Sequence, residues 1–262
     1  KLNNDQSLPL FNNATQAQKA PGSTFKPIIA VAALEEGVIG LNDTVNCTGI
    51  YKEITPALRC WIYPGQHGPL DVVHGIQNSC NVFFSEMGHR LSMDENGNYS
   101  PELGIEKIRK YASMFGLDET SGIEIAEREP QMTTEKPEAS SIGQGKNSYS
   151  NIQLSRYITA VANKGTVFKL SLLDKMTDSQ GNLLKDFTPE VRSTIDVKDS
   201  TWNAVHTGMR RVISDGSARK IFSDLEVDIA GKTGTAEEIK NGHRVNHAFF
   251  VSFAPCQNPE IA

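Results

Sequence analysis

The sequence is short of cysteine, of long apolar runs and of positive charge, and each shortage excludes a class of protein. Its 4 cysteines among 262 residues are too few for a disulfide scaffold, so a hydrophobic core must supply the stability. No run approaches the roughly 18 apolar residues of a membrane-spanning helix. Lys and Arg number 26 against 31 Asp and Glu, a net charge of −5, which argues against the basic face that nucleic-acid binding requires.

The chain does contain enough apolar sequence for a sizeable core. Hydrophobic residues make up 38% of its 262 positions, and no internal repeat or low-complexity tract divides it. A chain of this length typically buries about 70–75% of the surface that it exposes when unfolded. We therefore expect one large folded domain, or one domain with a small lobe.

The first strong element is a helix over residues 23–37. Pro21-Gly22 breaks the chain before it, Gly37 suits its C-terminal cap, and residues 28–34 are apolar on nearly all sides. This pattern predicts a buried central helix. Residues 38–69 are rich in turn formers and predict a long irregular excursion. Further helices are expected over residues 70–77, 82–91, 101–115, 152–163 and 200–213.

The C-terminal part changes to the period of strands. Residues 227–238 and 245–254 are strand-like, and Lys240-Asn241-Gly242-His243 between them predicts a hairpin turn. Residues 247–254 are nearly all apolar, so we expect this strand to be covered on both faces. The pattern predicts a sheet buried between helices.

The segment Ser23-Thr24-Phe25-Lys26 predicts a nucleophile at the start of the central helix. Residues i and i+3 of a helix share a face, so Ser23 and Lys26 meet at the first turn. Burial disfavours the charged form of a lysine, which would let Lys26 accept the Ser23 proton. About one Ser-x-x-Lys pattern is expected by chance in a chain of this length. We interpret the second one, Ser217-Ala218-Arg219-Lys220, as a solvated polar stretch, because no buried helix follows it.

Two other short patterns carry candidate site residues. Ser79-Cys80-Asn81 lies between two expected helices, where a polar trio is usually a cap. Lys232-Thr233-Gly234-Thr235 lies in an expected strand, where a glycine usually marks the close approach of another backbone. A substrate lying along the strand would meet donors from Lys232, Thr233 and Thr235. The alternative is an ordinary edge strand with a bulge.

In this order along the chain, the three patterns resemble the serine acyl transferases of the penicillin-recognising superfamily. Within it, the chain is similar to the high-molecular-weight penicillin-binding proteins, particularly the monofunctional class B transpeptidases. The segments that carry this closer resemblance are Pro21-Gly22-Ser23-Thr24-Phe25-Lys26-Pro27, Ser141-Ile142-Gly143-Gln144-Gly145, Tyr157-Ile158-Thr159-Ala160-Val161-Ala162-Asn163-Lys164-Gly165, Ala230-Gly231-Lys232-Thr233-Gly234-Thr235-Ala236, and His247-Ala248-Phe249-Phe250-Val251 with Phe253-Ala254-Pro255.

The resemblance implies an α/β fold of the α+β type. Helices would flank an antiparallel sheet, and an all-helical lobe would carry Ser79-Cys80-Asn81. Only residues 1–22 precede Ser23, and the sequence stops at Ala262. We therefore expect residues 1–262 to be a fragment of the transpeptidase domain that lacks the anchor, the pedestal, the first strands and the C-terminal strand and helix. The apolar strand at residues 247–254 would then be partly uncovered.

The resemblance also implies a D,D-transpeptidase that cross-links peptidoglycan stem peptides through a serine acyl-enzyme and that β-lactams acylate and inhibit. Ser23 would attack the carbonyl, Lys26 would be its base, and Ser79 would relay the proton toward the leaving amine, with Lys232 nearby. The substrate-binding residues would be Asn81 for an amide, Thr233, Gly234 and Thr235 for the terminal carboxylate, and the backbone N–H groups of Ser23 and Thr235 for the oxyanion.

By the same resemblance, the partners are stem peptides ending in D-Ala-D-Ala, β-lactams and the cell-wall synthesis machinery, without nucleic acid. The expected location is the extracytoplasmic face of the bacterial cell membrane, with an N-terminal anchoring helix absent from this chain. The chemistry requires no cofactor. One rival function is a non-enzymatic β-lactam sensor, and another is a serine β-lactamase. Class A β-lactamases carry a Glu-x-x-Leu-Asn-like element that activates water, and this sequence has none.

The cysteines allow three readings. Cys47, Cys60 and His67 fall in the irregular excursion, with Cys80 close behind. A Cys/Cys/His cluster would hold a structural zinc ion and pin a loop with little core of its own. A Cys47–Cys60 disulfide is the second reading, because the domain is expected outside the cytoplasm, and unlinked thiols are the third. The spacing matches no standard zinc motif. Cys80 is interpreted as a small packed residue.

Overall fold

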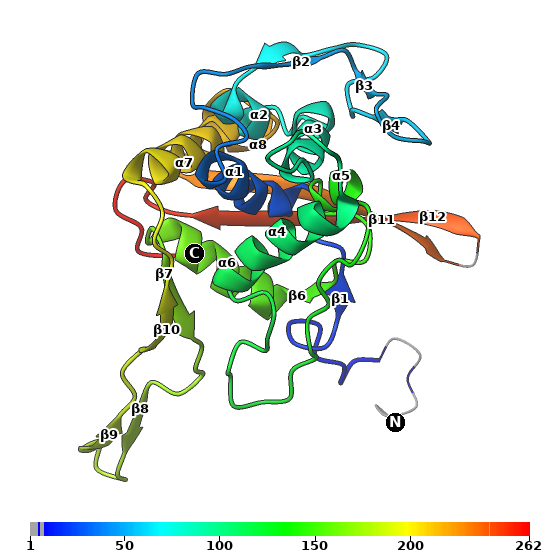
Figure 1. Ribbon diagram of the computed structural model, residues 1–262. Coiled ribbons are helices and arrows are strands. Elements are labelled where there is room, and N and C mark those ends of the chain that lie inside the picture. Colours follow the sequence, from blue (N-terminus) through cyan, green and yellow to red (C-terminus); the bar gives the residue numbers. More distant parts are fainter. Residues whose placement is uncertain (1–4, 6–7, 241) are drawn as a thin grey trace.

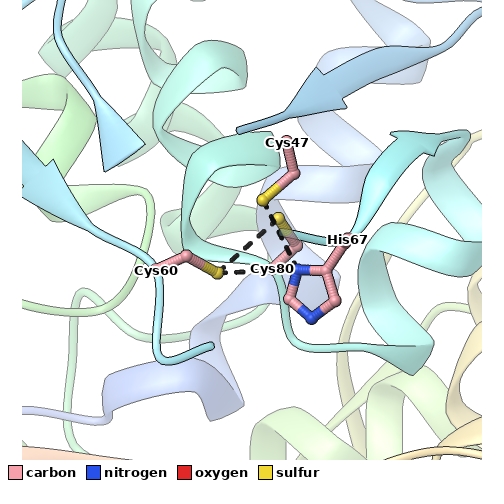
Figure 2. Close-up of side chains that lie close together, drawn as sticks. All are labelled: Cys47, Cys60, His67 and Cys80. Atoms are coloured by element: carbon pink, nitrogen blue, oxygen red, sulfur yellow. Dashed lines mark hydrogen bonds between the residues drawn. The ribbon is translucent and has the colours of Figure 1, made fainter. Parts of the chain in front are cut away.

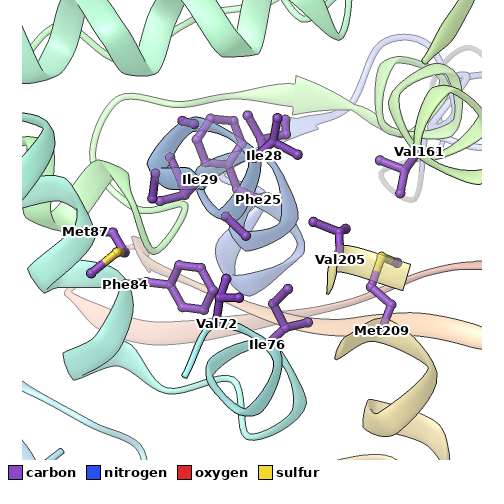
Figure 3. Close-up of a cluster of buried hydrophobic side chains, with 14 of the residues drawn as sticks. Phe25, Ile28, Ile29, Val72, Ile76, Phe84, Met87, Val161, Val205 and Met209 are labelled. Carbon is purple, nitrogen blue, oxygen red and sulfur yellow. The ribbon is translucent and has the colours of Figure 1, made fainter. Parts of the chain in front are cut away.

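The computed structural model describes residue 5, residues 8–240 and residues 242–262, without the side chains of residues 238–240 and 244. Helix α1 (Lys26–Glu35) is the buried central helix that the sequence predicts, and every residue from Lys26 to Leu34 is buried. Side chains such as Ile76, Phe84 and Val205 pack around it (Figure 3). Gly37, at φ +67°, ends the helix as predicted, because the N–H of Val38 bonds to the carbonyl of Ala33 at 3.0 Å.

The remaining predicted helices are present, with ends within two residues of the expected ones. The largest shift is at residue 70, where the helix begins instead at Val72 because the Asp71 side chain accepts the N–H of His74 as an N-cap. The helices after α1 are α2 (Val72–Gln77), α3 (Asn81–Leu91), α4 (Pro101–Met114), α5 (Pro137–Ser140), α6 (Asn151–Ala162), α7 (Asp199–Ser214) and α8 (Arg219–Phe222), and the 3₁₀ turn η2 (Gly22–Phe25) precedes α1.

The C-terminal hairpin lies against these helices. Strand β11 (Ala230–Lys240) pairs antiparallel with β12 (His243–Phe253), with Lys232 opposite Val251. The predicted turn joins them, although Asn241 lies outside the described residues. Helix α7 packs on β11 and α6 packs on β12, which confirms the prediction of an antiparallel sheet flanked by helices (Figure 1).

The expectation that both faces of β12 are covered is wrong. Phe250 is 41% exposed, and Ala248 is exposed as well. The Phe250 ring stacks only on Phe222 of α8 among the ring contacts described, at 5.1 Å between centroids, and a hollow of about 360 Å³ lined by Ala248, Phe250 and the α6 side chains Leu154 and Ile158 borders the strand. The apolar strand is therefore partly uncovered among the described residues.

The other strands are short two-stranded pairs. The excursion over residues 38–69 is less irregular than predicted, because two of these strand pairs, β2 with β5 and β3 with β4, form within it or at its end. A second hairpin arm over residues 175–186 projects from the body (Figure 1). The strands are β1 (Gln18–Lys19) with β6 (Tyr149–Ser150), β2 (Val45–Cys47) with β5 (Gly68–Leu70), β3 (Ile50–Tyr51) with β4 (Leu58–Arg59), β7 (Thr166–Lys169) with β10 (Glu190–Thr194), and β8 (Lys175–Thr177) with β9 (Leu183–Asp186).

Helices α2 to α5 form the predicted helical lobe, in which α3 packs on α1, α4 and α5. The connection from α2 to α3 is Asn78-Ser79-Cys80, and Asn81 begins α3, so the lobe presents the second predicted motif toward the hairpin. In the part of the chain that the structure describes, no helix is both long and apolar enough to cross a membrane.

Candidate active site

The predicted nucleophile lies on η2, and the predicted base is the first residue of α1. Ser23 and Lys26 are three residues apart, and such residues eclipse one another in a 3₁₀ turn. Lys26 is fully buried, and its Nζ donates to the carbonyl oxygen of Ser79 at 2.8 Å and to Asn81 Oδ1 at 2.8 Å. Its distance to Ser79 Oγ is 3.4 Å. The first two sequence motifs therefore meet through this lysine.

Ser79 occupies a backbone position that favours glycine. Its φ is +49°, and it ends α2 in a Schellman motif: its own N–H bonds to Ile76 at 3.0 Å, and the N–H of Cys80 bonds to Gly75 at 3.1 Å. A left-handed conformation costs an L-residue about 1–2 kcal/mol. Strain of this kind gathers at functional sites, where the side chain is needed in a fixed place. Here it directs the Ser79 hydroxyl toward the two buried lysines.

The second lysine comes from β11. Lys232 is fully buried, and its Nζ donates to Ser79 Oγ at 2.8 Å and to the carbonyl oxygen of Thr233 at 2.9 Å. Burial lowers the pKa of Lys26 to about 8 against the opposing effect of the nearby thiols of Cys80 and Cys60. Burial, together with repulsion from Lys26, lowers the pKa of Lys232 well below its ordinary value. The Ser79 hydroxyl thus lies between the amines of Lys26 and Lys232, both of which have a lowered pKa.

Three glycines allow β11 to lie against the nucleophile turn, which is the 3₁₀ turn η2 that carries Ser23. A Cβ on Gly234 would lie 2.9 Å from the Pro21 carbonyl oxygen and 2.8 Å from the Thr24 side chain. A Cβ on Gly22 would lie 2.5 Å from the Thr235 carbonyl oxygen, and one on Gly143 would lie 1.9 Å from the Gly22 oxygen. The prediction that Gly234 marks a close backbone approach is correct. The approaching backbone is the nucleophile turn itself, which corrects the expectation that the glycine makes room for a substrate.

The three motifs line one cleft of about 830 Å³. Ser23, Ser79 and Asn81 form one side, and Thr233 and Thr235 of β11 form the other. The remaining lining residues include Trp61, Gln144 and Ser217. Every predicted catalytic and substrate-binding residue therefore lies on this cleft or bonds to a residue that does.

Sequence reasoning missed Ser217 as a site residue. Its hydroxyl is exposed, as predicted, but it faces the cleft at 3.2 Å from Thr233 Oγ1. The adjacent Ala218 is fully buried, and its N–H bonds to Val212 at 3.0 Å, which fixes the turn after α7. The prediction of a solvated stretch is correct for Ser217, Arg219 and Lys220 and wrong for Ala218. The feature of the sequence that could have indicated a fixed position for Ser217 is the Gly-Ser-Ala turn after an amphipathic helix.

The predicted metal ligands Cys47, Cys60 and His67 lie close together, and Cys80 joins them (Figure 2). Cys47 Sγ lies 3.4 Å from His67 Nδ1, Cys60 Sγ lies 3.6 Å from the same nitrogen, and Cys60 Sγ lies 3.9 Å from Cys80 Sγ. The three thiols are buried and unlinked in the structure. Hydrogen bonding with Cys80, and from the backbone N–H of Asn81, lowers the pKa of Cys60. Cys80 is therefore part of this cluster and is more than a small packed residue.

Comparison with known proteins identifies the family. The family described as penicillin binding protein transpeptidase domain matches residues 1–262, the whole chain. The chain belongs to the penicillin-binding protein transpeptidase family. The class B resemblance seen in the sequence is confirmed, as is the fold expected from it.

Relatives of this transpeptidase domain are found among both sequences and structures. The peptidoglycan D,D-transpeptidase MrdA of Escherichia coli is 30% identical over 292 aligned residues, which cover 100% of this chain and 44% of that protein. A solved peptidoglycan synthase complex described as coordinating polymerization and crosslinking contains a chain that matches with a TM-score of 0.84 and 26% identity, over 97% of this chain and 43% of the other. Penicillin-binding protein 2 of Pseudomonas aeruginosa, solved in complex with WCK 5153, matches with a TM-score of 0.80 and 27% identity, over 98% of this chain and 58% of the other. The transpeptidase domain described here thus spans less than half the length of the curated relative.

Proposed function

We propose that this domain is a D,D-transpeptidase that cross-links peptidoglycan stem peptides through an acyl-enzyme on Ser23. One observation carries the proposal. Ser79 Oγ lies 2.8 Å from Lys232 Nζ and 3.4 Å from Lys26 Nζ, and it lines the same cleft as Ser23. Burial lowers the pKa of both lysine amines, so the Ser79 hydroxyl between them can pass protons beside the nucleophile Ser23.

The acylation step follows from these positions. Neutral Lys26 accepts the proton of the Ser23 hydroxyl, and Ser23 Oγ attacks the carbonyl carbon of the penultimate D-Ala or of a β-lactam. The backbone N–H groups of Ser23 and Thr235 donate to the oxyanion, since the turn and the strand are held together at the glycine contacts. The C–N bond then breaks, and the leaving amine takes a proton through Ser79, which Lys232 holds in place.

The remaining cleft residues bind the substrate in this proposal. Thr233 and Thr235 bind the terminal carboxylate, and Ser217 extends their row of hydroxyls. Asn81 binds an amide carbonyl of the donor peptide with its second side-chain N–H, since its Oδ1 accepts from Lys26 and its Nδ2 already donates one hydrogen to the Arg59 carbonyl oxygen at 3.2 Å. Gly234 does not touch the substrate in this proposal; its lack of a side chain lets β11 approach the turn that carries Ser23.

The names of the relatives support the same reading. The E. coli relative is named a peptidoglycan D,D-transpeptidase, and a structural neighbour belongs to a peptidoglycan synthase complex. We infer that stem peptides, β-lactams and the cell-wall synthesis machinery are the partners of this domain, and that it works outside the cytoplasm at the cell membrane, where its substrate lies. No relative named here favours a sensor or a hydrolase.

Labelling with a fluorescent penicillin tests the proposal. The unsubstituted chain should form a covalent adduct that lasts for many minutes, and peptide mapping should find it on Ser23. Ser23→Ala should abolish the label, whereas Ser217→Ala, which alters a hydroxyl in the same cleft, should keep it. An adduct on Ser217, or rapid release of hydrolysed penicillin, would refute the assignment of the nucleophile or of the transferase function.

We also propose that Cys47, Cys60, His67 and Cys80 hold a structural zinc ion. Zn–S bonds of about 2.3 Å and Zn–N bonds of about 2.0–2.1 Å give tetrahedral edges of about 3.8 Å between sulfurs and about 3.6 Å from sulfur to nitrogen. The distances of 3.9 Å for the Cys60 and Cys80 sulfurs, and 3.4 and 3.6 Å from sulfur to nitrogen, fit these edges. The ion would tie the excursion over residues 38–69 to the start of α3 and take no part in the acyl transfer.

Elemental analysis of the purified chain tests the zinc site, with one zinc per chain expected. Chelation should lower the melting temperature, and Cys60→Ser should do the same without added chelator. Cys256→Ser is the matched control, because Cys256 is also buried but lies outside the cluster. A chain without zinc that carries a Cys47–Cys60 disulfide would refute this proposal and restore the second reading of the cysteines.

A further inference from the structure

One thiol of the cysteine–histidine cluster, which consists of Cys47, Cys60, His67 and Cys80, borders the active-site cleft. Cys60 is among the residues that line this cleft of about 830 Å³, as is Ser23, and the other three members of the cluster are not. Although Cys60 is only 2% exposed, a small molecule that enters the cleft therefore meets its sulfur before any other sulfur of the cluster.

The Cys60 sulfur already lies beside a second thiol. Its Sγ is 3.9 Å from Cys80 Sγ, and both cysteines are unlinked (Figure 2). A disulfide requires the two sulfurs to approach by about 1.9 Å, to about 2.05 Å. A thiol that an oxidant can reach, next to a second thiol that it cannot, is the arrangement in which a sulfenic acid on the first is converted to a disulfide.

Cys80 joins two residues of the active site along the chain. Ser79 precedes it, and its hydroxyl accepts a hydrogen bond from Lys232 at 2.8 Å. Asn81 follows it, and its Oδ1 accepts a hydrogen bond from Lys26 at 2.8 Å. Cys80 Sγ also caps α3, the helix that begins at Asn81. A movement of the Cys80 sulfur therefore disturbs both the backbone and the helix cap that hold these two residues in place.

The segment that carries Cys60 is bonded to the same motif. Asn81 Nδ2 donates to the carbonyl oxygen of Arg59 at 3.2 Å, so the end of β4 lies against the start of α3. A bond between Cys60 and Cys80 would pull these two segments out of their present register. A displacement of about 1 Å at a catalytic group can slow a reaction about 100-fold.

We propose that Cys60 and Cys80 are a redox switch: a peroxide that enters the cleft joins them as a disulfide, and the disulfide halts acylation of Ser23. This inference rests on the proposed function, because acylation is the reaction that the switch controls. The domain is proposed to work outside the cytoplasm, beyond the glutathione and thioredoxin that keep cytosolic thiols reduced. The oxidised form should therefore persist until a dithiol reduces it by exchange.

The oxidation balances with hydrogen peroxide as the only co-reactant. The Cys60 sulfur attacks one peroxide oxygen, the O–O bond breaks, and the departing hydroxide takes the Cys60 proton as a first water, which leaves a sulfenic acid. The Cys80 sulfur then attacks the Cys60 sulfur and the S–O bond breaks. The hydroxyl leaves with the Cys80 proton as a second water. Two electrons pass from the two thiols to the peroxide.

The switch uses two of the four residues proposed to hold zinc. In the zinc-bound form the same sulfurs are thiolates, which is the form that attacks a peroxide, and the protons of the two waters then come from solvent. With Cys60 and Cys80 joined, only Cys47 and His67 remain of the four ligands of a structural site. Release of zinc is therefore a second readout, independent of acylation.

The test treats the full chain, with its metal content as purified, with hydrogen peroxide and then removes the peroxide with catalase. Peptide mapping without reductant should find Cys60 linked to Cys80, at a mass lower by two hydrogen atoms. Acylation by fluorescent penicillin should be about 100-fold slower than in the untreated chain. A chelating dye should detect the released zinc, and dithiothreitol should restore the acylation rate.

Cysteine variants identify the thiols responsible. In Cys60→Ser and in Cys80→Ser, the treated and untreated chains should acylate at equal rates; each comparison is made within one variant, so a lower starting rate does not affect it. Cys256→Ser is the matched control, because Cys256 is buried but lies outside the cluster and the cleft, and it should keep the full slowing. The linked peptide and its reversal are measured on the unsubstituted chain, so they decide the matter where a serine variant does not fold.

The outcomes are distinguishable. An unchanged acylation rate after oxidation, slowing without a Cys60–Cys80 link, or equal slowing in Cys60→Ser overturns the switch and leaves the transpeptidase function standing. A link between Cys47 and Cys60 in place of the expected one also overturns it. The expected link and slowing without released zinc support the switch and overturn the zinc site. Absence of acylation in the reduced, untreated chain overturns the proposed function, and the switch fails with it.

Discussion

The left-handed backbone of Ser79 allows a quantitative test of how the site is built. Ser79→Ala and Ser79→Gly both remove the hydroxyl that accepts from Lys232 at 2.8 Å, so the loss of that bond is common to the two variants. They differ in the backbone, because at φ +49° alanine carries the full strain and glycine carries almost none. The difference between the two variants therefore isolates the strain.

The expected size of that difference follows from two opposing effects. The left-handed conformation costs alanine about 1–2 kcal/mol. The glycine variant loses about 0.4–1 kcal/mol of this advantage, because its unfolded chain has more conformational entropy to lose on folding. The net advantage of Ser79→Gly over Ser79→Ala is about 1 kcal/mol, or about 2–4 °C in melting temperature for a domain of this size.

Thermal unfolding of the two variants in one buffer checks this value, and penicillin labelling should be lost or strongly slowed in both. The Schellman bonds from Ser79 and Cys80 do not involve the side chain of residue 79, so α2 should end in the same way in each variant. A glycine variant that melts at or below the temperature of the alanine variant would refute the reasoning that Ser79 is held against its backbone preference.

Three further outcomes are expected. The rate of penicillin acylation should rise as the pH increases through about 8, because Lys26 must lose its proton before it can accept one, and a rate that falls over this range would contradict that role. Gly234→Ala places a Cβ 2.8 Å from the Thr24 side chain and pushes β11 away from the nucleophile turn, so acylation should slow about 100-fold or more in a stopped-flow assay. Ser217→Ala should slow acylation a few-fold, about 1 kcal/mol in the barrier, through the lost contact with Thr233, and an unchanged rate would exclude Ser217 from carboxylate binding.

The sequence could predict those parts of the site that depend on local spacing. The proximity of Ser23 and Lys26 follows from helical geometry alone, and the buried helix after them follows from its composition. The meeting of Ser79 with Lys232 follows from no periodicity, because the two residues are 153 positions apart. That contact was expected only through the family resemblance.

The residues that were missed or misread have non-local causes. Cys80 joins Cys47 because β2 and the α2–α3 connection meet in space, and no spacing rule reports this. Ser217 enters the cleft because Ala218 beside it is buried, which its polar surroundings in the sequence conceal. The partial exposure of β12 depends on which other elements cover it in space, which an apolar strand pattern does not encode.

The contacts of Gly22, Gly143 and Gly234 around the nucleophile turn limit which substitutions the proposed transpeptidase could accept under selection by β-lactams. Each of these positions lacks room for even one added carbon, so a chain that survives must keep all three glycines and with them the geometry that an inhibitor exploits. Substitutions that lower β-lactam acylation but keep the proposed transfer to stem peptides should therefore arise at the entrance of the cleft, at side chains such as Arg59, Trp61 or Gln144. β-Lactams that contact mainly the backbone around these glycines, and few side chains at the entrance of the cleft, should retain their potency longest.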